Sequence, residues 1–173
     1  MKAYNFNRDL AAKAHADTNH IYDKGGKNHP YIYHLDMAVE AARKFKHLIP
    51  ENVYFEVETG IYFHDAIEDA RLTYNDVLKL TKSEIAANIA YACTNLRGKT
   101  RQERASVGYY VFITHTLYAP FAKLCDRIAN MTYSKREGSS MHKTYIKEYP
   151  NFKEQLYDEH YKEMFDYIES ELM

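Results

Sequence analysis

Apolar residues recur at the spacing of an α-helix along most of this chain, and no other feature limits its fold as strongly. In "YIYHLDMAVEAARKF", residues 31–45, one helical face carries Ile32, Leu35, Val39 and Ala42. Residues that break helices are scarce, with 6 glycines and 4 prolines among 173 residues. Alternating apolar and polar residues, which are typical of strands, are nearly absent, and "VYFEV" at 53–57 is the best candidate strand. We therefore predict an all-α protein.

Glycines, prolines and capping residues divide this pattern into separate helices. The expected helices cover residues 5–22, 31–45, 50–66, 81–95, 103–118 and 120–135. Thr81 and Glu84 have the spacing of a capping box at the start of the fourth of these helices. Residues 139–173 predict two or three amphipathic helices that are broken at Pro150. The chain has no internal repeat or linker, so we expect residues 1–173 to form one compact helical bundle, with a C-terminal helical extension from about residue 136.

Composition and charge exclude several classes of protein. The net charge is −1 with neutral histidines, so no positive field indicates nucleic acid or a membrane surface as a partner. No apolar run approaches the ~20 residues that span a bilayer, and the N-terminus has no signal-peptide core. The two cysteines, Cys93 and Cys125, form no CxxC motif, which argues against a disulfide framework or a cysteine-based zinc site. We expect a cytoplasmic protein.

The segment "IYFHDAIEDA", residues 61–70, concentrates titratable side chains in a helix that otherwise reads as buried: His64, Asp65, Glu68 and Asp69. On a helix, His64 and Glu68 are four residues apart, and so are Asp65 and Asp69, so the two pairs share one side. Three carboxylates this close raise one another's pKa, and a divalent cation relieves that cost, with the imidazole as a further ligand. The alternative is a solvated helix face, because acidic clusters near helix ends are common.

Two other segments carry related side chains. His34 lies one turn into an amphipathic helix, and Asp126 lies inside the apolar stretch "FAKLCDRIANM". Arg127 is beside Asp126, and Asn130 follows one turn later. A buried aspartate needs a partner or a metal ion. From the residues alone, His34 could equally be an exposed or a core histidine, and Asp126 could be one half of an ion pair.

The order of His34, then His64-Asp65, then Asp126 resembles the H…HD…D signature of HD-domain metal-dependent phosphohydrolases. Four segments, "PYIYH", "HDAIED", "TNL" and "KLCDRIANM", together resemble the hydrolase domain of the alarmone (guanosine tetra- and pentaphosphate) synthetase/hydrolase family, including its small hydrolase-only members. The similarity covers about residues 20–135. It implies a single all-α HD-domain helical bundle.

The resemblance also implies roles for individual residues. The positions that match the family's metal ligands are His34, His64, Asp65 and Asp126, and the implied cofactor is a divalent metal, most often Mn²⁺. Glu68 and Asp69 match the acidic pair that positions and activates the attacking water. Substrate contacts are expected from Arg127 and Asn130, near the bound nucleotide, and from Thr94 and Asn95, in a turn beside it.

Basic residues in two loops are further candidates for substrate binding. The loop "LRGKTRQERA" supplies Arg97 and Arg104, which could hold distal phosphates, although a solvated loop with Glu103 as counter-charge is the alternative. In the other loop, "YDKGGKNHP", the family usually has an Arg-Lys-Ser-Gly type sequence whose arginine helps to hold guanine. Here the basic residues are Lys24 and Lys27, and lysine stacks on a base less well than arginine. The family's "DRLHNM" also reads "DRIANM" in this chain.

These observations favour a metal-dependent hydrolase of a nucleotide, specifically a guanosine 3′,5′-bis(diphosphate) 3′-pyrophosphohydrolase. One alternative is an HD-type 5′-nucleotidase or nucleoside triphosphate hydrolase. Another is a catalytically inactive nucleotide-binding module. The tyrosine-rich C-terminal helices either cover the core or form a homo-oligomer contact, and the sequence leaves both open.

Overall fold

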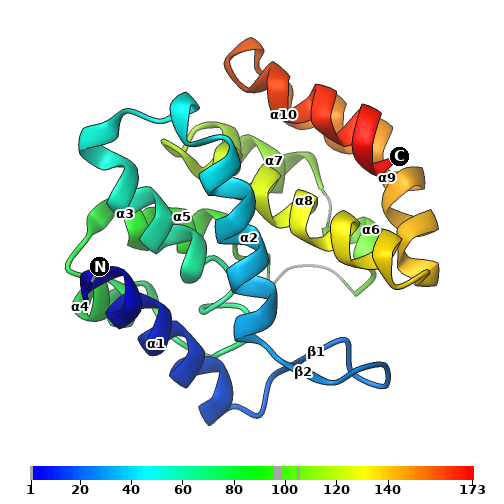
Figure 1. The fold of residues 1–173 in the computed structure, drawn as a ribbon. Coiled ribbons are helices and arrows are strands. Elements are labelled where there is room, and N and C mark those ends of the chain that lie inside the picture. The colour runs from blue at the N-terminus through cyan, green and yellow to red at the C-terminus, as the bar shows by residue number, and fades with distance from the viewer. Residues whose placement is uncertain (1, 96–98, 105) are drawn as a thin grey trace.

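The computed structural model describes residues 2–95, 99–104 and 106–173, and it confirms the predicted all-α class (Figure 1). The first part of the chain forms α1 (Lys2–Asp17), α2 (Ile32–Lys44), α3 (Glu51–Tyr62), α4 (Tyr74–Thr81) and α5 (Glu84–Cys93). The remainder forms α6 (Arg101–Arg104), α7 (Val107–Thr114), α8 (Ala119–Arg136), α9 (Ser140–Leu156) and α10 (Lys162–Tyr167). Short 3₁₀ turns cover Lys46–Leu48 and Glu159–Tyr161, and a π-helical turn covers Ile168–Leu172.

The core lies where α2, α3, α5 and α8 meet. Helix α2 packs against α8 on one side and α3 on the other, and α3 packs in turn against α5. The contact faces of α2 and α5 are rich in fully buried alanines, such as Ala38, Ala42, Ala87 and Ala90, which let helix backbones approach closely. In Figure 1, α1 and α4 lie on one side of α2, and the C-terminal helices α9 and α10 lie on the other, beyond α8.

A short hairpin follows α1, where the sequence pattern predicted continued helix. Helix α1 ends at Asp17, and the strands β1 (Ile21–Tyr22) and β2 (His29–Pro30) then pair in antiparallel register. The chain takes left-handed backbone angles at Asn19, Asp23, Gly25 and Asn28. Asparagine, aspartate and glycine tolerate these angles best, so the local residue types stop the helix and turn the chain.

Other differences from the expected elements also have local causes. The segment "VYFEV" is part of α3 and not a strand, because its buried residues Tyr54 and Val57 have helical spacing. The unpredicted helix α4 begins with a capping box of Thr73 and Asp76 and ends at Thr81. The cap of α5 is therefore Ser83, whose hydroxyl accepts from the Ala86 N–H, and not Thr81. Helix α9 continues through Pro150, where a break was expected.

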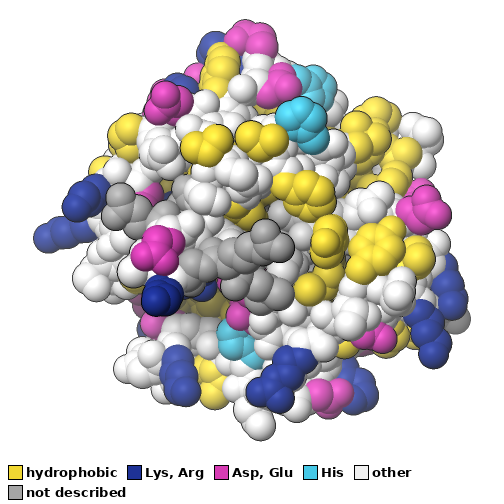
Figure 2. Space-filling view, turned by 180° about the vertical axis from the view of Figure 1, so that it is seen from behind, with side chains coloured by type: hydrophobic (Ala, Val, Ile, Leu, Met, Phe, Trp, Pro, Cys, Tyr) yellow, Lys and Arg dark blue, Asp and Glu magenta, His cyan; other side chains and the backbone are white. Residues whose placement is uncertain are grey.

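The surface mixes charged and apolar side chains. Figure 2 shows basic and acidic residues distributed around one face of the molecule, with apolar side chains gathered over part of it. The most exposed large apolar side chains among the described residues are Leu117 (69%), Val107 (63%), Phe6 (60%) and Tyr91 (52%). No helix in the described ranges is long and apolar enough to cross a bilayer.

We predict that Gly60→Ala lowers the free energy of unfolding by about 1–3 kcal/mol, because it overpacks the contact between α3 and α5. A Cβ at residue 60 would lie 2.7 and 2.9 Å from two side-chain carbons of Ile89 and 3.2 Å from the Ala86 Cα. Gly108→Ala is the matched control, because a Cβ at that helical position meets nothing within 4 Å. Chemical denaturation of both variants measures the difference, and an equal effect in the two would contradict the close packing at Gly60.

Candidate metal centre

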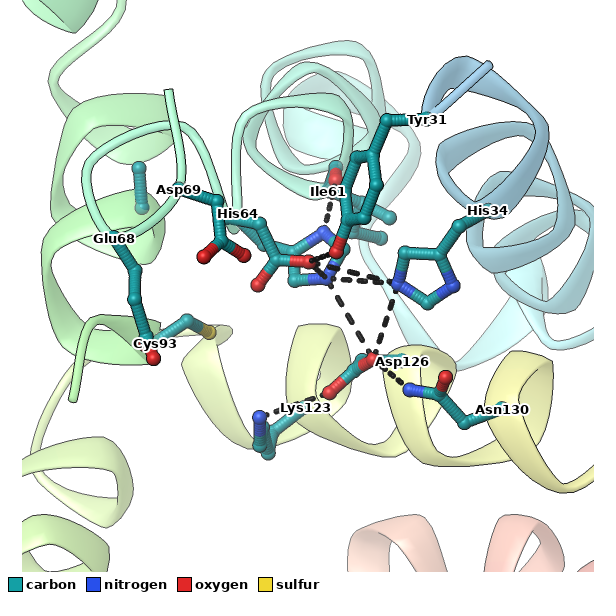
Figure 3. Close-up of polar contacts among 12 residues, drawn as sticks. Tyr31, His34, Ile61, His64, Glu68, Asp69, Cys93, Lys123, Asp126 and Asn130 are labelled. Carbon is teal, nitrogen blue, oxygen red and sulfur yellow. Dashed lines mark hydrogen bonds and ion pairs between the residues drawn. The ribbon is translucent and has the colours of Figure 1, made fainter. Parts of the chain in front are cut away.

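Three segments that are distant in sequence bring ionisable side chains to one buried point (Figure 3). His34 comes from the first turn of α2, His64 and Asp65 from the turn that follows α3, and Asp126 from the middle of α8. The packing of α2 against α3 and α8 sets this convergence. His34 and His64 are 1% exposed, and Asp65 and Asp126 are 16% and 12% exposed, measured on the side chains.

The donor atoms of this cluster lie at distances that suit a metal ion. The His34 and His64 Nε2 atoms are 3.4 Å apart, and Asp126 Oδ1 lies 3.3 and 3.7 Å from them. These three residues form a group that can hold a metal ion. Asp65 Oδ2 approaches the same two nitrogens at 3.6 and 2.9 Å. Donors bound ~2.1 Å from one ion lie about 3 Å apart when their bonds are at right angles.

The His64 ring is fixed in the tautomer that a metal ligand requires. Its Nδ1 lies 2.7 Å from the Ile61 carbonyl oxygen, within the last turn of α3. A carbonyl oxygen can only accept a hydrogen bond, so Nδ1 carries the proton. The Nε2 lone pair of the neutral ring therefore points into the cluster (Figure 3). Among the described residues, the buried Nδ1 of His34 has no such partner.

Neighbouring side chains hold the two carboxylates. The Tyr31 hydroxyl donates to Asp65 Oδ2 at 2.5 Å. On α8, Asn130 Nδ2 donates to Asp126 Oδ1 at 2.5 Å, and Lys123 Nζ donates to Asp126 Oδ2 at 2.8 Å (Figure 3). These bonds leave each carboxylate little freedom to rotate, which is how outer contacts orient metal ligands.

Contacts within the cluster determine its charge. Burial lowers the pKa of His34 and His64, but the adjoining carboxylates more than offset this, so both imidazoles have raised pKa values. Burial raises the pKa of Asp65 and Asp126, but the imidazoles, together with Lys123 for Asp126, hold both pKa values well below the usual range. Without an ion, protons on the imidazoles therefore balance the negative charge of the carboxylates. The donor set fits a divalent cation, which would take the place of those protons.

The segment "HDAIED" is not the regular helix that the sequence pattern predicted. Helix α3 ends at Tyr62, and residues 63–69 form consecutive turns, with the Asp69 N–H bonded to the Asp65 carbonyl at 2.8 Å. The helical pairing of His64 with Glu68 was therefore wrong as a description of the backbone. The turns nevertheless place Asp65, Glu68 and Asp69 on the wall of one cavity of about 200 Å³.

Glu68 and Asp69 lie beside the metal-binding group and outside it (Figure 3). Glu68 Oε2 accepts from the Asn95 backbone N–H at 2.9 Å, and its Oε1 lies 3.6 Å from an Arg104 nitrogen. Burial raises the pKa of Glu68. Burial, followed by the charges of Asp65 and Glu68, raises the pKa of Asp69 to about 7.

The cavity beside the cluster has basic as well as acidic side chains in its walls. Lys123 and Arg127 line it, together with Asn130 and Tyr145. Arg127 pairs with Glu148 at 3.2 Å and stacks over the rings of Tyr145 and Phe152. A second cavity, of about 160 Å³, adjoins the first and shares Asn130 and Tyr145 with it. Its other lining residues are Tyr22, Asp23, Tyr133, Ser134, Ser139 and Met141.

The other predicted substrate residues lie at varying positions relative to these cavities. Asn95 and Arg104 adjoin Glu68, and the Asn95 side-chain amide also bonds to the Arg104 carbonyl. The Thr94 hydroxyl donates to the Ala90 carbonyl at the end of α5. Lys24 and Lys27 lie in the hairpin turn, where Lys27 pairs with Glu137, and neither lines the two cavities. Arg97 falls outside the described residues, and all these binding roles stay predictions.

Sequence reasoning missed two residues that contact the cluster directly. Lys123 lies three residues before Asp126, so its place on the same face of α8 was readable from helical spacing. Tyr31 lies three residues before His34 and reaches Asp65 across the site. Comparisons of the chain with family models, curated proteins and solved structures found no match. The geometry alone indicates a buried group able to bind a metal ion, next to two acidic side chains and two basic ones.

We predict that purified protein contains about one divalent transition metal per chain, and that Asp126→Ala removes most of it. Saturating metal should also raise the thermal midpoint of the unaltered protein, because a ligand that binds only the folded state stabilises it. Asp9→Ala, which removes an exposed carboxylate on α1, is the control and should keep its metal. Elemental analysis and thermal unfolding with and without Mn²⁺ measure both effects. Full metal occupancy in folded Asp126→Ala would exclude this site.

Proposed function

We propose that this protein is a metal-dependent phosphohydrolase of a nucleotide, with guanosine 3′,5′-bis(diphosphate) as the favoured substrate and pyrophosphate as the leaving group. One observation carries the proposal. The Nε2 atoms of two imidazoles each lie within 3.7 Å of two carboxylates, and two further carboxylates, Glu68 and Asp69, line the cavity beside them. Such a site has separate groups for holding a metal ion and for moving a proton.

The residues proposed to hold the metal are His34, His64, Asp65 and Asp126. Imidazole and carboxylate ligands suit Mn²⁺ or a similar divalent ion of the first transition series. An ion bound there supplies positive charge to phosphate oxygens and increases the acidity of a coordinated water. The buried position of His34 and His64 keeps bulk water from competing with the ligands.

Glu68 and Asp69 are proposed to orient the attacking water and to accept its proton. Glu68 suits this role because the Asn95 N–H fixes one of its oxygens at 2.9 Å. The raised pKa of Glu68, caused by burial, makes its carboxylate a stronger base than an exposed glutamate. Asp69 lines the same cavity, one residue further along the turn.

Charge and shape in the two cavities support a nucleotide as the substrate. Lys123 and Arg127 line the first cavity and offer positive charge to phosphate groups. The second cavity is bordered by the rings of Tyr22, Tyr133 and Tyr145 and suits a planar base. It adjoins the first through Asn130, so one molecule could occupy both. No arginine lies in residues 23–30, so discrimination of guanine from adenine should be weaker than in arginine-bearing alarmone hydrolases.

The missing loop arginine also favours the second candidate, an HD-type hydrolase of another nucleotide, such as a 5′-nucleotidase or nucleoside triphosphate hydrolase. A catalytically inactive nucleotide-binding module is the third. The presence of both Glu68 and Asp69 beside the proposed ligands argues against loss of turnover. Products separate these candidates more directly than any structural feature.

The test of the proposal is a substrate panel. We predict that the Mn²⁺-loaded protein releases pyrophosphate from guanosine 3′-pyrophosphates, as measured by chromatography and phosphorus NMR of the products. Guanosine and adenosine 5′-mono- and triphosphates are the comparison substrates. Release of inorganic phosphate from the 5′ position alone would contradict the pyrophosphohydrolase proposal and support the 5′-nucleotidase. Metal-loaded protein that binds nucleotides without hydrolysing any would support the inactive module.

A pair of variants separates proton transfer from metal binding. Glu68→Gln keeps the shape of the side chain but removes the base, and such a loss typically lowers kcat by ~10²–10⁴-fold. We predict that Glu68→Gln keeps its metal, whereas His64→Ala loses metal and activity together. Glu154→Gln, at an exposed position on α9, is the control and should leave both unchanged. Metal content and kcat are measured on the same preparations. A near-normal kcat in metal-loaded Glu68→Gln would assign the proton transfer to another group.

A further inference from the structure

Two histidines that are not among the proposed metal ligands lie next to Tyr31 and Asp69. His15, near the end of α1, and His20, just before β1, both stack against the Tyr31 ring, with centroid separations of 4.4 and 3.9 Å, and their own centroids are 5.2 Å apart. His15 is buried, whereas the His20 side chain is 27% exposed and its Nε2 lies 3.9 Å from Asp69 Oδ2. The same segment contacts the turns at residues 63–69 a second time, because the Thr18 hydroxyl donates to the Asp69 carbonyl at 3.4 Å.

The contact between the two histidines determines which nitrogens carry protons. Their Nδ1 atoms are 3.0 Å apart, so one of them donates and the other accepts. Burial lowers the pKa of His15 to about 4, which leaves this ring neutral at pH 7 with a single N–H. Within the described part of the chain, the buried Nε2 of His15 has no hydrogen-bond partner.

Two tautomer arrangements are available, and one is clearly better. If His20 donated to His15, the His15 N–H would be at the buried, unpartnered Nε2, and the His20 Nε2 lone pair would face the Asp69 carboxylate. A buried N–H without a partner is among the most costly groups in a protein, and the facing lone pair repels Asp69 whenever its carboxylate is ionised. If His15 donates to His20, both faults vanish. The His20 proton then lies on Nε2 and points toward Asp69.

We propose that His20 is a positioning residue, whose Nε2–H faces Oδ2 of Asp69 at 3.9 Å and favours the carboxylate orientation in which the other oxygen is directed at the attacking water. This inference rests on the proposed function of Asp69. His15 sets the tautomer of His20 through the Nδ1 contact, and Tyr31 fixes the plane of the ring by stacking. Among the described residues, His20 has the one basic side chain within 4.0 Å of the Asp69 carboxylate. Without His20 this carboxylate would be free to rotate.

The expected effect of His20→Ala is a fall in kcat of about 10-fold or more, with KM and metal content unchanged, because loss of an outer partner of a site residue typically costs 10–100-fold in activity. His20→Gln keeps an N–H on the side chain and should restore part of the loss. In an Asp69→Asn background, His20→Ala should cause no further fall, since its effect passes through Asp69. His115→Ala, at an exposed position after α7, is the control and should be neutral.

A second measurement is independent of activity. Nitrogen NMR of the zinc-loaded, diamagnetic protein should find His20 as the Nε2–H tautomer, and Asp69→Asn should shift that Nε2 resonance. An Nδ1–H tautomer of His20, an Nε2 resonance that ignores Asp69→Asn, or full additivity of the two substitutions would each overturn the inference. If the unaltered protein hydrolyses no nucleotide, the proposed function fails separately, and the two NMR results still decide the contact between His20 and Asp69.

Discussion

The burial of two carboxylates against two imidazoles is the constraint on which the rest of this structure depends. Removing an ion from water costs several kcal/mol, and the cost is recovered only when each charge has good partners. Both carboxylates contact the two imidazoles. Asp65 also accepts a hydrogen bond from Tyr31, just before α2, and Asp126 accepts from Lys123 and Asn130 on α8. Close helix packing brings these donors within reach of the two carboxylates. The alanine-rich faces of α2 and α5 and the glycine at residue 60 allow this close packing.

A second layer of contacts surrounds this cluster. The end of α1 and the start of the hairpin supply His15, Thr18 and His20, which contact Tyr31 or Asp69. On the opposite side, Asn95 reaches from the end of α5 to Glu68. The acidic pair is thus held from two directions, by segments that do not contribute to the metal-binding group. Such support allows the ligands and the acidic pair to be altered separately.

The sequence predicted the helical class, most helix positions and the meeting of His34, His64 and Asp126. The helical class and the helix positions were predicted from the spacing of apolar residues, because the buried faces of α2, α3 and α8 are almost uninterrupted. The third came only from a resemblance, since no spacing within one helix indicates which helices touch. The turns at residues 63–69 were missed because they keep a helical bond, from the Asp69 N–H to the Asp65 carbonyl, and resemble helix in local pattern. The hairpin was missed because its pairing of Ile21 with Pro30 leaves no periodic signal in so short a strand. Tyr31 and His20 were missed because their partners lie more than 30 residues away.

The spacing of the ligands along the chain has a consequence for folding. His34 and His64 are separated by 30 residues, and Asp126 lies ~60 residues further on. An ion held by all three would close two large loops and join α2 to α8, in a chain whose two cysteines are both buried and unpaired. It would act as a reversible crosslink, with the entropic benefit that loop closure brings to the native state. The ligands can meet only after these distant helices have docked, so the crosslink would form late and would slow unfolding more than it hastens folding.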